Sequence, residues 1–146
     1  MRAQDYLELK ERQQKEINEF PVAYAFDEKQ LTEALKKLGV NDISECVTVC
    51  ELGDIMKKED APRFVEMLKR HTKEVQDALV ADKDFALEAF LYEMDNHEYA
   101  INYDGDGDVL GCFGLEMDDL EAMGLDTVYQ LARKKHFDHM REWGVL

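Results

Sequence analysis

Three aspartates alternate with glycines in the segment Asp104-Gly105-Asp106-Gly107-Asp108. Hard cations such as Ca²⁺ take oxygen ligands, and alternate aspartates in a tight loop can converge on one ion. The segment departs from the EF-hand pattern, because the sixth and twelfth positions hold Val109 and Leu115 in place of glycine and glutamate. Asp104, Asp106 and Asp108 are thus candidate ligands for a divalent cation, in a loop that does not match an EF-hand. The alternative is a plain acidic hairpin turn.

A second group of ionisable residues lies at the expected end of a central helix, where Glu93, Asp95, His97 and Glu98 follow one another closely. A histidine beside carboxylates can be tuned to act as a general base. A histidine just beyond a helix C-terminus is also stabilised by the helix dipole, and its position is then explained without a catalytic role. The sequence has no nucleophile elbow, HExxH, P-loop or complete GxGxxG motif. We therefore assign no catalytic residue and leave enzyme activity open, with a non-enzymatic role favoured.

The pairs Cys46-x₃-Cys50 and His136-x₂-His139 have the donor types of a zinc site. If residues 46–52 form a strand, the two cysteines lie about 13 Å apart at ~3.3 Å per residue. Two thiolates on one Zn²⁺ must each lie about 2.3 Å from it. The sequence thus disfavours zinc at these residues, and we expect all three cysteines to be reduced.

The acidic residues are concentrated in one third of the chain. The formal net charge is −15, and residues 76–126 hold fifteen acidic side chains and a single basic one, Lys83. Direct binding to nucleic acid or to an anionic membrane is disfavoured, because both require a basic footprint. A basic protein partner or divalent cations are more compatible with this charge. The alternative is a solvated acidic face that serves only solubility.

The acidic stretch also fits a protein that mimics DNA. DNA carries one charge per about 1.7 Å of its axis, and its binding proteins present basic grooves. A folded domain with carboxylates on helices and turns can compete for such a groove, provided that the carboxylates share one face. The residues predicted to contact the partner are Asp77, Asp84, Glu88, Asp95, Glu116, Asp118, Asp119 and Glu121.

An α+β fold is expected to position these residues. Apolar residues recur with helical spacing at 3–20 and after the capping residues Asp27, Asp60 and Asp84, which predicts a helix in each of these places. Further helices are predicted at 117–123 and from about residue 126. Short strands are predicted at 22–26 and 46–52. Alternating apolar residues around the Asp-Gly repeat predict a hairpin over 97–115. We thus expect about five helices packed on a small antiparallel sheet that contains this hairpin.

The length of 146 residues predicts one domain, 1–146, and a hydrophobic content of 45% supports a core rather than disorder. The longest runs without Asp, Glu, Lys, Arg or His, 20–26 and 109–115, are seven residues long, and a membrane span needs about 20. No apolar signal core follows Met1, so a cytoplasmic location is expected. The amphipathic helix at 3–20 leaves a homodimer open.

Five segments spread over most of the chain carry a resemblance: Leu9–Pro21, Ala25–Gln30, Lys57–Ala61, Leu91–Tyr99 and Gly114–Leu120. Their order resembles a family of small acidic uncharacterised bacterial proteins associated with mobile elements of anaerobic Gram-positive bacteria. The resemblance transfers no catalytic or binding residue. It implies an accessory role in a plasmid, phage or transposon, a context in which counter-defence proteins that mimic DNA occur.

These observations predict a non-enzymatic acidic protein that engages a basic partner, such as a nucleic-acid-binding protein, through residues 76–126. The alternative is a metal-binding protein or a small metal-dependent enzyme that uses the Asp104–Asp108 loop. No cofactor is expected apart from the divalent cation of that alternative.

Overall fold

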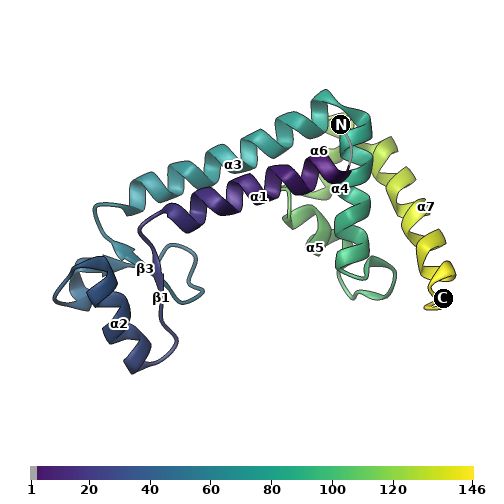
Figure 1. Cartoon of the computed structure of the whole chain (residues 1–146). Coiled ribbons are helices and arrows are strands. Elements are labelled where there is room, and N and C mark those ends of the chain that lie inside the picture. Colours follow the sequence, from purple (N-terminus) through teal and green to yellow (C-terminus); the bar gives the residue numbers. More distant parts are fainter. Residues whose placement is uncertain (1–2) are drawn as a thin grey trace. The chain divides into compact units, whose positions relative to one another are not determined.

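The computed structural model describes residues 3–146 and divides into two compact units (Figure 1). Unit 1 comprises the described residues up to Glu11 together with Thr72–Leu146, and unit 2 comprises Arg12–His71. Helices α1 (Ala3–Glu19) and α3 (Ala61–Ala81) each contribute residues to both units. That residues 1–146 form a single domain stays a prediction.

Unit 1 is built around α4 (Lys83–Asn96), which packs along α7 (Asp126–Glu142), as Figure 1 shows. Between these helices in the sequence lie a 3₁₀ turn, Tyr99–Ile101, and two short helices, α5 (Gly105–Gly111) and α6 (Met117–Ala122). The side chain of Asp82 begins α4 by accepting hydrogen bonds from the backbone N–H groups of Asp84 and Phe85. Such a cap satisfies amide groups that have no partner within the helix.

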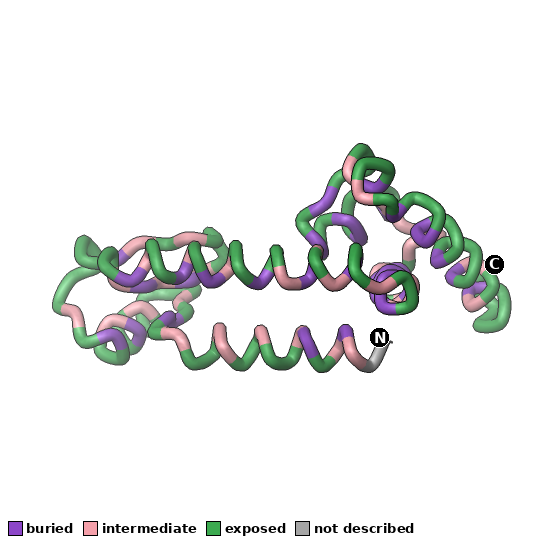
Figure 2. Tube along the Cα trace, turned by 90° about the horizontal axis from the view of Figure 1, so that it is seen from above, coloured by how far each residue is buried: buried purple, intermediate pink, exposed green. Residues whose placement is uncertain are grey.

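Aromatic rings fill the core of unit 1. The ring of Phe90 lies edge-to-face with those of Phe113 and Tyr129, each with a centroid separation of 5.2 Å. Edge-to-face pairs add to the free energy gained from burying the rings. Figure 2 shows how buried and exposed residues alternate along α7, the helix that ends at the C label. One side of α7 therefore closes this core.

Unit 2 contains the sheet. Strands β1 (Ala23–Tyr24), β2 (Cys46–Val47) and β3 (Asp54–Lys57) pair antiparallel in the order β1-β3-β2. Helix α2 (Glu28–Leu38) packs against β1 and β3, and a 3₁₀ turn, Ile43–Glu45, leads into β2. The cap of α2 confirms the sequence signal, because Asp27 accepts from the Gln30 N–H and Gly39 ends the helix with φ 73°.

The strand predicted over 46–52 is shorter, because the carboxylate of Asp54 binds the residues that follow β2. It accepts hydrogen bonds from the Thr48 hydroxyl (2.8 Å) and from the backbone N–H groups of Val49 (2.9 Å), Cys50 (3.2 Å) and Leu52 (3.2 Å). These donors would otherwise need a neighbouring strand. One buried side chain therefore closes the turn between β2 and β3.

The α+β class is confirmed, with seven α-helices among the described residues where about five were expected. The predicted hairpin over 97–115 is wrong, because the Asp-Gly repeat forms helix α5. The Asp104 side chain accepts from the Gly107 N–H (3.1 Å), and the Asp108 N–H binds the Asp104 carbonyl (3.0 Å). Aspartate and glycine suit a tight turn, but aspartate also starts helices, and here the helix cap prevails.

Candidate functional site

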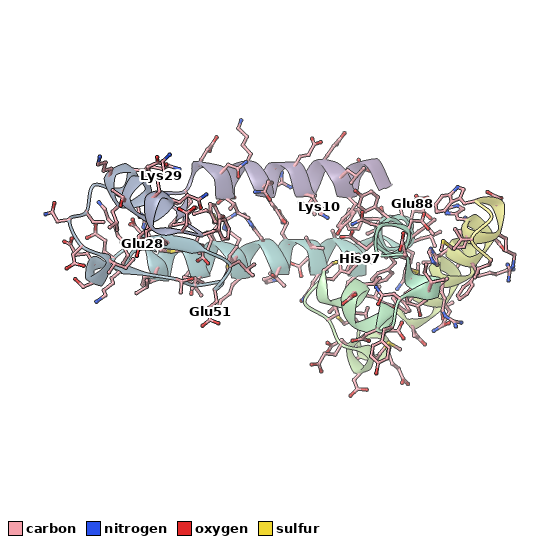
Figure 3. The ribbon with its side chains drawn as sticks, turned by 90° about the horizontal axis from the view of Figure 1, so that it is seen from below. Lys10, Glu28, Lys29, Glu51, Glu88 and His97 are labelled. Atoms are coloured by element: carbon pink, nitrogen blue, oxygen red, sulfur yellow. The ribbon has the colours of Figure 1, made fainter. Side chains whose placement is uncertain are left out.

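The eight carboxylates predicted to bind a partner all belong to unit 1. Asp84, Glu88 and Asp95 lie on α4 at spacings of four and seven residues, which places them on one face of that helix. Asp84 is exposed and Glu88, which is labelled in Figure 3, is half-buried. Part of the acidic set therefore shares a helix face, as the mimicry idea requires.

Other predicted residues lie on α3 and around α6. Asp77 is exposed and pairs with Lys73, with a distance of 2.8 Å from Nζ to Oδ2. Glu116 and Asp119 form a capping box at the start of α6, in which Asp119 accepts from the Glu116 N–H at 2.8 Å. Asp118 and Glu121 are exposed on the same helix. The structure thus gives some of these carboxylates a local structural role and leaves others facing solvent.

Asp95 is bound within unit 1. Its two carboxylate oxygens lie 2.7 Å from Nδ1 of His136 and 2.9 Å from Nδ1 of His139. The buried His136 ring accepts the Ala100 N–H at Nε2 (3.0 Å), so its proton resides on Nδ1 and is donated to Asp95. Asp95 therefore fixes α7 against α4.

The three aspartates of the predicted metal loop have separate partners. Asp104 caps α5, and Asp108 accepts from the Asn102 amide at 2.9 Å. Asp106 accepts from the hydroxyl groups of Tyr99 (2.7 Å) and Tyr129 (2.6 Å). Burial, followed by the hydrogen bond to Asp106, raises the pKa of the Tyr129 hydroxyl, so Tyr129 remains a donor. Cation binding by this loop stays a prediction.

A different group of donor atoms converges nearby in unit 1. A carboxylate oxygen of Glu93, a ring nitrogen of His97 and the Sγ atom of Cys112 lie within 4.8 Å of one another. Glu93 and His97 are four residues apart, so the C-terminal turn of α4 brings them together. Cys112 ends α5 and lies with its Sγ atom 3.4 Å from Nε2 of His97. We call these three residues the Glu-His-Cys cluster.

Glu93 is the buried member of the cluster, with 1% of its surface exposed. Its Oε2 atom accepts from the Tyr6 hydroxyl (2.7 Å) and from Lys10 Nζ (3.1 Å), both of which come from α1 (Figure 3 labels Lys10 and His97). Its Oε1 atom is buried and has no hydrogen-bond partner among the described residues. Burial, followed by the hydrogen bond to Glu93, raises the pKa of Tyr6, so Tyr6 remains protonated and donates.

The thiol of Cys112 is held in its neutral form. Burial and then the negative charge of Glu93 raise the pKa of this thiol to about 11. Its Sγ atom lies 3.3 Å from the Asp108 carbonyl and donates to it. A reactive cysteine needs a lowered pKa. The surroundings of Cys112 therefore do not activate it as a nucleophile.

Comparison with family models gives a match over residues 5–135. The chain belongs to DUF7659, a family of unknown function. Neither the curated proteins nor the solved structures gave a significant match to this DUF7659 chain. Within its described part, no helix combines the length and the apolar character needed to cross a bilayer.

Glu93 and His97 stand out in the sequence of this DUF7659 chain, but no sequence pattern connects them with Cys112, Tyr6 or Lys10. The spacing of four between Glu93 and His97 was the available signal for a shared helix face. Cys112 reaches them only because residues 105–111 are helical, and the hairpin prediction placed it elsewhere. Tyr6 lies 87 positions from Glu93, a separation at which no local pattern operates.

Proposed function

We propose that this DUF7659 chain is a non-enzymatic binding protein that uses carboxylates of residues 76–126 to engage a basic protein. The observation that carries the proposal is the ratio of fifteen acidic residues to one basic residue in this stretch. The exposure of Asp84, Asp118 and Glu121 supports it. Their negative charge raises the local concentration of a cationic partner and speeds the encounter.

More specifically, the proposed partner is a nucleic-acid-binding protein whose basic groove receives these carboxylates. A surface of this kind competes with a phosphate backbone through the same screened attraction that makes DNA binding salt-dependent. An accessory role in a mobile element, as the family resemblance implies, belongs to this proposal. In this proposal the eight predicted carboxylates form the contact surface, and Asp95 contributes least because two histidines already bind it.

To test this proposal, the chain is immobilised on resin, and the heparin-binding proteins of a bacterial lysate are passed over it. Specific proteins are expected to bind at low salt and to be released by high salt or by duplex DNA. A chelator is expected to change nothing. Retention that resists both salt and DNA would contradict the proposal.

Two variants with the same change in net charge make the test specific. The first replaces exposed or half-exposed acids of unit 1, and the second replaces exposed acids of unit 2. The two sets are Asp84→Asn, Glu88→Gln, Asp118→Asn and Glu121→Gln, and, as the control, Glu28→Gln, Glu33→Gln, Glu51→Gln and Glu59→Gln. The first variant should lose the captured protein and the control should keep it. Equal retention by both would refute the assigned surface.

A further inference from the structure

We propose that the Glu-His-Cys cluster of Glu93, His97 and Cys112 binds one transition-metal ion, with Zn²⁺ as the best match. This site is distinct from the Asp104–Asp108 loop and uses none of its carboxylates. It is also independent of the acidic surface, so either proposal can fail without the other.

The distances in the cluster suit a small coordination sphere. With Zn–S near 2.3 Å and Zn–N near 2.0–2.1 Å, two ligands of a tetrahedral ion are separated by about 3.5 Å. The Sγ atom of Cys112 and Nε2 of His97 are 3.4 Å apart. Because all three donor atoms lie within 4.8 Å of one another, the Glu93 oxygen needs to move by at most about 1.3 Å to reach that spacing.

The unpartnered oxygen of Glu93 also supports a bound ion. A buried acceptor without a partner is costly because its hydration is lost without replacement, yet Oε1 of Glu93 has no partner among the described residues. In the proposed site, Glu93 presents this oxygen to the ion, which would satisfy it. The other oxygen, Oε2, is held by Tyr6 and Lys10. Hydrogen bonds of this kind orient a ligating carboxylate and tune its basicity, which makes Tyr6 and Lys10 positioning residues.

The donor set selects the class of metal. Sulfur and imidazole nitrogen are ligands of Zn²⁺ and related transition metals, whereas Ca²⁺ and Mg²⁺ require oxygen ligands throughout. On binding, the Cys112 Sγ–H bond breaks, an S–metal bond forms and the proton passes to solvent. Three protein ligands leave the fourth position of a tetrahedral ion for water or another small ligand.

A cysteine–histidine pair can also serve as a nucleophile and its base. The raised pKa of the Cys112 thiol argues against that alternative, because a nucleophilic cysteine must be a thiolate near neutral pH. A metal ion deprotonates a coordinating thiol by itself. The same surroundings that disfavour a nucleophile therefore remain compatible with a metal ligand.

To test this proposal, the reduced, chelator-treated full chain is titrated with Co²⁺, and the bound Co²⁺ is then displaced with Zn²⁺. One equivalent of Co²⁺ is expected to produce a thiolate-to-cobalt charge-transfer band, and one equivalent of Zn²⁺ should abolish it. Cys112→Ser should remove the band. Cys50→Ser, which removes an exposed thiol of unit 2, should leave it unchanged. Absence of the band in the natural chain, or its persistence in Cys112→Ser, would overturn the proposal.

Two further variants identify the other ligands. His97→Ala should weaken Co²⁺ binding at least tenfold, whereas His139→Ala, which alters the separate Asp95 contact, should not. Circular dichroism confirms that each variant is folded. Zn²⁺ should raise the melting temperature of the natural chain, and Ca²⁺ and Mg²⁺ at matched ionic strength should not. An equal rise with Zn²⁺ in Cys112→Ser would refute the Glu-His-Cys cluster as the binding site.

Discussion

Tyr6 donates its hydroxyl hydrogen to Oε2 of Glu93 at 2.7 Å, although the two residues are 87 positions apart in the sequence. The same ring lies against Phe85 and Phe113, with centroid separations of 5.9 and 5.6 Å. One side chain of α1 therefore joins the aromatic core of unit 1 to its buried carboxylate. The contact gives helix α1 a role in the stability of unit 1.

Removing only this hydroxyl should destabilise the protein. Tyr6→Phe keeps the ring packing but removes one of the two donors to Oε2 of Glu93 that the structure describes, and we expect a loss of about 1–3 kcal/mol in unfolding free energy. Urea denaturation followed by circular dichroism measures it. Tyr103→Phe is the control, because Tyr103 is fully exposed. Equal stability of the two variants would show that the Tyr6 hydroxyl contributes nothing.

The Asp54 carboxylate should give unit 2 an acid-sensitive stability. Burial raises its pKa, but the hydrogen bonds from Val49, Cys50, Thr48 and Leu52 outweigh burial and lower it from 3.8 to about 2. A pKa lowered by folding contributes stability above the ordinary value, and that contribution is lost as the pH falls from 3.8 towards 2.

Asp54→Asn should therefore remove about 1.5–3 kcal/mol at neutral pH. It should also flatten the dependence of stability on pH between 4 and 2, which denaturant titrations across that range would detect. Asp27→Asn is the control, because asparagine and aspartate cap helices equally well. A natural chain and an Asp54→Asn variant with parallel pH profiles would contradict the assignment.

The two histidines that bind Asp95 should differ sharply in importance. His136 is fully buried and also accepts the Ala100 N–H, so His136→Ala leaves the half-buried Ala100 N–H without this partner and creates a cavity. We expect a loss of about 2–4 kcal/mol for this variant. His139 is partly exposed, and His139→Ala should cost less than about 1 kcal/mol. Thermal or urea unfolding measures both, and a reversed order would refute this interpretation.

The aspartates of α5 should likewise be unequal. Asp106→Ala deprives the buried Tyr129 hydroxyl of its acceptor, and we expect a loss of about 1–3 kcal/mol. Asp108→Ala removes an exposed contact with Asn102 and should cost less than about 1 kcal/mol. The comparison is made by chemical unfolding at neutral pH. Similar losses for both variants would mean that Asp106 is not a structural anchor.

The parts of the fold that depend on neighbouring residues were predictable from the sequence. Asp27 and Gly39 mark the ends of α2 because a cap and a left-handed residue act over a single turn. The short helix before Gly124 and the helix from Asp126 follow from the same kind of signal. The α+β class rests on these local patterns.

The hairpin and the cluster could not be predicted, because they depend on distant partners. The Asp-Gly repeat allows either a turn or a helix start, and Asp106 is fixed in a helix by Tyr129, 23 positions further on. An error in the predicted structure of that one segment also misplaces Cys112, which is the third member of the Glu-His-Cys cluster. The eight predicted carboxylates were identified by charge, but charge alone does not distinguish the bound Asp95 from the exposed Asp118.

Unit 1 is assembled from two separate stretches of the chain, since its described part ends at Glu11 and resumes at Thr72. A fragment that starts at Thr72 lacks Tyr6 and Leu9, two buried residues of the unit 1 core. Such a fragment would expose apolar surface and leave Glu93 without its tyrosine donor. Adding a peptide of α1 in trans should restore its fold, which makes this protein suited to splitting into two complementing pieces.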